Sequence, residues 1–194
     1  MDDSSLRRAV RFVGLANFAY FFVEFAVALH IGSVSLFADS VDFLEDASVN
    51  FLILLALGWS LKARARIGMG LAALLLWPAI ATLWMVWHQF TTLTPPDPIL
   101  LSATGAGALV VNLTCAYRLA KYRHHSGSLT KAAFLSARND AFANIGIIFA
   151  GFITLATHSA WPDLIVGLAI AAMNIDAAKE VWTAAKEEHL EAKS

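Results

Sequence analysis

The sequence has little cysteine, little net charge and few residues that interrupt helices. Its 194 residues include one cysteine, Cys115, so neither a disulfide framework nor a thiolate metal cluster can form within the chain. The formal net charge is −1, which leaves no basic surface for nucleic acid. Charged residues make up 15% of the chain and hydrophobic residues 58%, with a mean hydropathy of +0.63. This balance is far from that of a soluble domain and indicates an integral membrane protein.

Long apolar segments divide the chain into six predicted transmembrane helices. A span needs roughly 20 apolar residues to cross about 30 Å of hydrocarbon. Prolines in the segment TTLTPPDP must end a helix, because proline lacks the amide donor and crowds the preceding turn. We therefore expect an all-α polytopic membrane protein with a single transmembrane domain over residues 1–194 and no soluble domain. The predicted spans are approximately 9–31, 33–60, 67–90, 98–120, 128–157 and 161–183.

Basic residues predict the orientation of these spans. In a six-span arrangement they gather at the two termini and at two connections on the same side, and the opposite connections carry none. Since loops rich in Lys and Arg stay in the cytoplasm, we expect both termini to be cytoplasmic and the chain to lie in the cell membrane. The residues that follow this pattern are Arg7, Arg8, Arg11, Lys62, Arg64, Arg66, Arg118, Lys121, Arg123, Lys131, Lys179, Lys186 and Lys193.

The second predicted span carries a concentration of acids that is unusual for a membrane. Charged groups in the hydrocarbon region are costly, face the bundle interior and mark function. Like charges so close together need protons or a cation between them. A divalent metal that binds the deprotonated acids, and leaves when they are protonated, meets this need. At about 100° per residue one stripe of this helix holds Asp39, Asp42, Asp46 and Asn50, with Glu45 beside it.

The alternative explanation is structural: the acids cap the helix start or pair with arginines. It fits Asp39 best, because this residue lies within the first two turns of the predicted span. We therefore expect Asp39 to cap the helix or to lie at the entrance of the ion's path through the membrane. We expect Asp42 and Asp46 to bind the ion.

The fifth predicted span presents oxygen donors on one face. Ser136 and Asn144 each lie about 40° from Asp140 around the helix, whereas Arg138 lies about 160° away. In the first span Asn17 and Glu24 share a face. Hydrogen bonding between helices is the simpler explanation of these two and of Asn112. A secondary polar path for protons through Asp39, Glu45, Glu24 and Asn17 is the functional alternative.

Several segments match one known family in order and spacing. They are NFAYFFVE at 17–24, SVSLFADSVDFLED at 33–46, VNL at 111–113, the Asp140 and Asn144 pair, and WPDLIVG at 161–167. Together they resemble the cation diffusion facilitator family of metal–proton antiporters, over essentially the whole chain. The resemblance implies a metal efflux transporter rather than an enzyme, with no prosthetic group and no nucleic-acid partner.

In that family the transport site lies between the second and fifth spans, with a pair of ligands four residues apart on each. The resemblance therefore implies Asp42, Asp46 and Asp140 as ligands of the metal. The fourth position falls on Ser136, where the family usually has His or Asp, and Asn144 or water would complete the site. Zinc is the default cargo, but a site made only of oxygen donors also leaves Co, Fe, Mn, Ni and Cd open.

A second expected departure from the family is the absence of the C-terminal cytoplasmic domain that commonly supports dimerisation. A homodimer would then form through the spans, where Ala103 with Gly107, or Gly146 with Ala150, would allow close packing.

Two other functions are open. One is a non-transporting metal sensor or assembly partner of the same fold. The other is a membrane-embedded hydrolase that uses Glu45 and Asp46 with a metal, although such enzymes generally present paired histidines.

Overall fold

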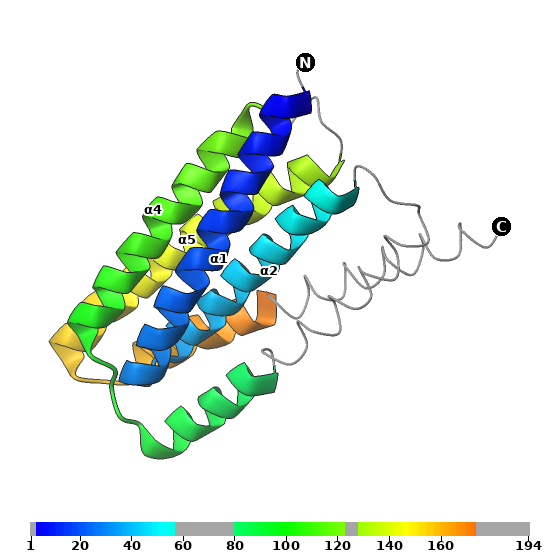
Figure 1. Cartoon of the computed structure of the whole chain (residues 1–194). Helices are drawn as coiled ribbons and strands as arrows, with labels where there is room; N and C mark the ends of the chain where they lie inside the picture. The colour runs from blue at the N-terminus through cyan, green and yellow to red at the C-terminus, as the bar shows by residue number, and fades with distance from the viewer. Residues whose placement is uncertain (1–2, 57–79, 123–127, 174–194) are drawn as a thin grey trace.

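The structure is a computed structural model that describes residues 3–56, 80–122 and 128–173 (Figure 1). Within these ranges the chain forms six helices and no strand, so the predicted all-α fold class is confirmed there. Helices of residues 80–92 and Trp161–Met173 accompany the four labelled helices. The labelled helices are α1 (Asp3–Ile31), α2 (Val34–Ala56), α4 (Pro98–Ala120) and α5 (Ser128–Thr157).

Two helices have the bounds that the sequence predicted, whereas α1 begins at Asp3 instead of residue 9 and the helix 80–92 ends two residues beyond the predicted 90. The spans predicted at 98–120 and 128–157 are α4 and α5. Gly32, at φ 68°, separates α1 from α2 in a conformation that suits glycine. Asp97 accepts hydrogen bonds from the amides of Ile99 and Leu100, both at 2.9 Å, and so caps the start of α4. The predicted ends at 60, 67 and 183 lie outside the described residues.

Three of the described helices are long and apolar enough to cross a membrane: Ser5–Ile31, Pro98–Ala120 and Ser136–Thr157. The helix Trp161–Met173 is apolar but shorter. With 23 residues α2 has the length of a span, but its four carboxylates reduce its apolar character. Large apolar side chains are exposed along the outer faces of the bundle, which is the surface that lipid requires.

The described helices pack as a bundle in which α1 lies against α2 and α4 against α5 (Figure 1). Further contacts of α1 with α4 and of α2 with α5 close the bundle. Two apolar clusters fill its ends: Val10, Val13, Ile53, Cys115, Leu119 and Ala137 at one, and Ala28, Leu36, Phe37, Leu101, Ile147 and Ile170 at the other. The free Cys115 is buried in the first of these clusters.

Three of the four small residues that were considered for a dimer contact other helices of the same chain. A Cβ on Gly107 would collide with the Tyr20 hydroxyl, which donates to a backbone carbonyl of α4 at 2.7 Å. Gly146 faces the helix Trp161–Met173, and Ala150 is 2% exposed. Each proposed pair therefore has at least one member inside the bundle, because only Ala103 of the four is exposed to its surroundings.

Candidate functional site

Between the two apolar clusters, polar side chains from four helices meet in the interior of the bundle. No lysine or arginine lies among the buried polar residues of the described ranges. The buried acids and amides of this interior are Asn17, Glu24, Asp39, Asp46, Asn50, Asn112, Asp140 and Asn144. Burial of several acids without a basic partner is the arrangement that needs protons or a metal ion for neutralisation.

Asp46 of α2 is bound by neutral donors from two other helices. The Ser136 hydroxyl of α5 donates to its Oδ1 at 2.9 Å, and the Asn17 amide of α1 donates to its Oδ2 at 3.3 Å. The Cys115 thiol donates in turn to Asn17 Oδ1 at 3.6 Å. The hydrogen bonding between helices that was expected of Asn17 is observed, and Ser136 of α5 contacts Asp46 of α2.

Asp42 and Asp140 place carboxylates from α2 and α5 toward the same interior. Asp140 is 9% exposed and Asp42 is half-buried. Glu45 is half-buried beside Asp46. Arg138 is exposed and points away from Asp140, as its helical position predicted.

The carboxylates share this interior but do not form a complete metal-coordination site. In the ranges that the structure describes, no three His, Cys, Asp or Glu side chains converge closely enough to hold a metal ion. Like charges repel one another when no cation lies between them. The arrangement therefore supplies ligands from two helices that a bound cation would have to draw together.

Asp39 lies two turns before Asp46 and has different partners. The Asn144 amide donates to its Oδ2 at 2.5 Å, and Asn144 Oδ1 accepts from Asn112 at 3.0 Å. Within the described part of the chain Asp39 Oδ1 has no hydrogen-bond partner, and the residue is fully buried. The expected capping role of Asp39 is wrong, because its carboxylate bonds across the bundle to α5 and other groups cap α2. The predicted interhelical role of Asn112 is confirmed.

Glu24 of α1 is fully buried, and neither of its carboxyl oxygens accepts a hydrogen bond from the residues that the structure describes. Its carboxyl group lies within hydrogen-bonding reach of Asp39. Two ionised carboxylates can only accept, so a hydrogen bond forms between them only when one carries a proton. The hydrogen bonding between helices that was expected of Glu24 therefore has one available partner, Asp39, and requires a proton.

The start of α2 is held by Asp163, which stood in a recognised motif but had no predicted role. Its carboxylate accepts from the amides of Val34 and Ser35 at 2.8 and 3.2 Å. It also accepts from the hydroxyls of Ser33 and Ser35 at 2.7 and 2.5 Å. The amide of Leu36 donates to Ser33 Oγ at 3.2 Å. Three of the unpaired amides that every helix start presents are thus satisfied.

Gly167, one turn after Asp163, allows the helix Trp161–Met173 to approach the start of α2. A Cβ there would lie 2.6 Å from the Val34 side chain and 2.9 Å from the Ser35 amide. Asp163 and Gly167 together fix where α2 begins, and hence the height of its acids in the bundle. The signal in the sequence was a lone acid in the first turn of an apolar span without a basic residue near it.

Comparison with known proteins agrees with the site and with the resemblance seen in the sequence. No curated protein matched the chain. A family model described as the cation efflux transmembrane domain matches residues 10–186, a range that includes every residue of the polar interior. Members of this family transport divalent metal cations, and the family is one of transporters rather than of enzymes. The chain belongs to the cation diffusion facilitator family of cation efflux transporters.

Proposed function

We propose that this protein exports a divalent metal of the zinc class from the cytoplasm in exchange for protons. Asp42 and Asp46 of α2 and Asp140 of α5 bind the ion, with Ser136 and Asn144 as auxiliary ligands. The remaining acids and Asn17 carry or stabilise the exchanged protons.

The observation that supports this proposal most strongly is the hydrogen bond between Ser136 and Asp46. It brings the faces of α5 and α2 that carry acids to the same height in the bundle. Asp140 lies one turn along α5 from Ser136 and is buried on the same side. Two helices thus contribute carboxylates to one interior. Among the described residues, no basic side chain is buried there.

Metal binding at this interior would exchange one set of partners for another. Asp46 would give up the hydrogen bonds from Ser136 and Asn17 and use its oxygens on the metal. The ion would offset the repulsion between Asp42 and Asp140 and draw their carboxylates together. Because the ligands must be deprotonated to bind, loading would release protons, and protonation from the other side would release the metal.

Asn144 links this site to the proposed proton path. Its amide nitrogen donates to Asp39 and its oxygen accepts from Asn112, which leaves the oxygen one further lone pair for a metal. Movement of Asn144 toward an ion would weaken its bond to Asp39. Asp39 and Glu24 would then compete for a proton, while Glu45 stands beside Asp46 at the other end of the path.

The donor set suggests which metals are carried. Carboxylates, a hydroxyl and an amide form a harder site than one that contains histidine. Zinc remains the default cargo because the family carries divalent cations of this class, and Co, Fe, Mn, Ni and Cd are the competitors to test. Ser136 is the position at which selectivity would be set.

We further propose six spans, both termini in the cytoplasm and residence in the cell membrane. The start of α1 and the end of α4 lie at the same end of the bundle (Figure 1). This end carries Arg7, Arg8, Arg11, Arg118 and Lys121, which is the clustering that the positive-inside rule associates with the cytoplasm.

Purified protein in proteoliposomes tests the function. Zinc is added outside vesicles that contain a zinc-sensitive dye or, in a parallel set, a pH-sensitive dye. The proposal predicts zinc entry that is driven by an outward proton gradient and accompanied by proton movement in the opposite direction. Saturable zinc binding without any flux would contradict it and assign the chain to the sensor alternative instead.

A further inference from the structure

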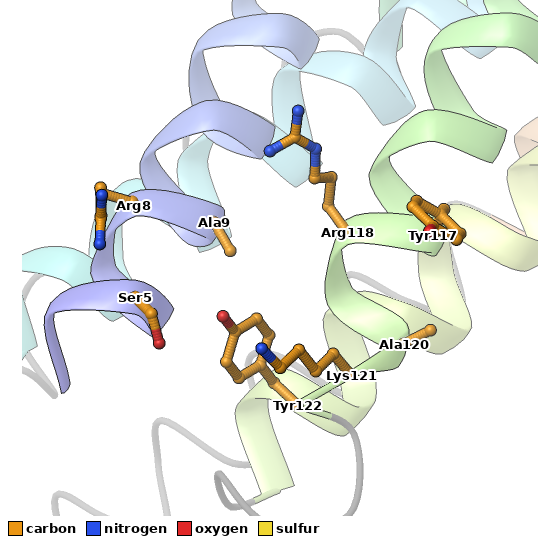
Figure 2. A pocket seen from close by; sticks show the side chains of 8 residues that line it. All are labelled: Ser5, Arg8, Ala9, Tyr117, Arg118, Ala120, Lys121 and Tyr122. Atoms are coloured by element: carbon orange, nitrogen blue, oxygen red, sulfur yellow. The ribbon is translucent and has the colours of Figure 1, made fainter. Parts of the chain in front are cut away.

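A pocket of about 460 Å³ opens between the start of α1 and the end of α4, away from the metal site. Figure 2 shows Ser5 and Ala9 on one side of a gap between the two helices and Arg118, Lys121 and Tyr122 on the other, with Arg8 and Tyr117 farther out. Ser5, Arg8 and Ala9 come from α1, and Tyr117, Arg118, Ala120, Lys121 and Tyr122 come from the end of α4 and the turn after it.

The lining of this pocket is cationic. It contains Arg8, Arg118 and Lys121, and no carboxylate is among its described lining residues. The Arg118 guanidinium lies 4.6 Å from the centre of the Phe12 ring on α1, and the Lys121 ammonium lies 5.8 Å from the centre of the Tyr122 ring. Such cation–π contacts hold the two cations at the gap without neutralising them. The pocket therefore suits a phosphate anion.

An apolar strip continues from the pocket along the outer face of α4. Tyr117 is 81% exposed, Leu113 53% and Val110 64%. Their spacing of four and three residues places them on one face of the helix. A cationic pocket joined to an exposed apolar strip matches a molecule with an anionic head and a hydrocarbon tail.

We propose that this pocket binds the headgroup of an anionic phospholipid, with an acyl chain lying along Tyr117, Leu113 and Val110. A phosphate diester carries the charge that Arg118 and Lys121 attract, and basic pockets between helix ends at a membrane surface hold such headgroups. Free phosphate shares the headgroup chemistry but has nothing to place on the apolar strip.

Native mass spectrometry of the purified full-length chain tests the proposal, with phosphatidylglycerol added to the detergent. The pocket variant is R118Q/K121Q, and R7Q/R11Q is its control. The control removes two exposed positive charges from the same end of the bundle, neither of which lines the pocket. We expect the pocket variant to bind phosphatidylglycerol at least about tenfold more weakly than the native chain. The control should stay within about twofold.

Binding of other lipids and of inorganic phosphate shows whether the bound anion is a lipid headgroup or free phosphate. Phosphatidylcholine should bind far more weakly than phosphatidylglycerol, and inorganic phosphate at equal concentration should not displace it. Equal losses in the two double variants would overturn the proposal by assigning binding to general charge. Displacement by inorganic phosphate would overturn the lipid assignment.

A charge-conserving variant guards against misfolding. R118K/K121R keeps two cations at the pocket and should retain phosphatidylglycerol binding within about threefold of the native chain. Loss of binding in this variant, with an unchanged helical circular dichroism spectrum, would contradict a site based on charge.

Discussion

Two acids on α2, Asp39 and Asp46, differ in their hydrogen-bond partners. Both oxygens of Asp46 accept hydrogen bonds from neutral side chains, one on α1 and one on α5. Among the described residues Asp39 has one donor and one oxygen without a partner, and its neighbour Glu24 receives no hydrogen bond. A metal can replace the neutral donors at Asp46 without leaving a charge unpaired. Around Asp39 the carboxyl oxygens outnumber the hydrogen-bond donors, so this end of the interior suits a bound proton.

The largest predicted effect separates these two ends directly. Asp46→Asn removes a proposed ligand and should weaken zinc binding by at least about 100-fold, since loss of a ligand exceeds the 10–100-fold cost of losing an outer partner. Asp140→Asn should match it. Asp39→Asn should retain zinc binding within about tenfold but reduce the protons moved per metal. Isothermal titration of zinc and the proteoliposome assay measure the two quantities.

If Asp39→Asn abolishes zinc binding while Asp46→Asn leaves it intact, the metal-binding and proton-binding roles of the two acids have been exchanged. Equal loss in both variants would instead merge them into one site.

The next prediction concerns the anchor of α2. Asp163→Ala removes four buried hydrogen bonds to a carboxylate and should lower the free energy of unfolding by about 2–4 kcal/mol. Asp97→Ala is the matched control, because Asp97 also caps a helix but is exposed, and it should cost only about 1 kcal/mol. Denaturant unfolding in mixed micelles, followed by circular dichroism, gives both values.

The same anchor should affect the near end of α2 more than the far end. Asp39 is five residues from the start of the helix and Asp46 is twelve. Asp163→Asn keeps the shape of the side chain and should disturb proton coupling more than zinc affinity. A variant that loses zinc affinity while coupling per metal stays native would show that the anchor acts on Asp46 instead.

Substitutions of Ser136 test the metal-binding end of the interior, and their expected effects on zinc binding are smaller. Ser136→Ala removes the donor to Asp46 and should weaken zinc binding by about tenfold. Ser136→His introduces a nitrogen ligand and should favour zinc over manganese by a similar factor. Competition titrations with the two metals measure the shift. A metal preference identical in all three proteins would remove Ser136 from the ligand set.

The smallest effect concerns Glu24. Glu24→Gln supplies an amide donor beside the unpartnered Asp39 oxygen, so it should raise the free energy of unfolding by about 1 kcal/mol. Fewer protons should accompany each metal, because one carrier is gone. A less stable variant with native coupling would show that Glu24 and Asp39 do not exchange a proton.

Much of this arrangement could be predicted from sequence because it depends on local rules. Apolar length and proline positions predicted α4 and α5, and helical periodicity predicted that Asp140 and Ser136 share a face while Arg138 turns away. These inferences need only one helix at a time.

Partners between helices could not be predicted in this way. Periodicity places Asp39 on the same stripe as Asp46 but does not give the depth at which Asn144 meets it. The capping of α2 depends on Asp163, a residue nearly 130 positions away. The roles of Gly107 and Ala150 likewise depend on which helix is nearest, which the spacing of small residues alone does not give.

A crystal structure of the protein with zinc, using anomalous scattering at the zinc edge, tests the central claim most directly. The account predicts one strong peak between α2 and α5, with carboxylate oxygens of Asp46 and Asp140 at about 2.0–2.2 Å. Asp42 should lie in the same shell. A peak held by Glu24 and Asp39, with Asp46 still bound by Ser136 and Asn17, would contradict it.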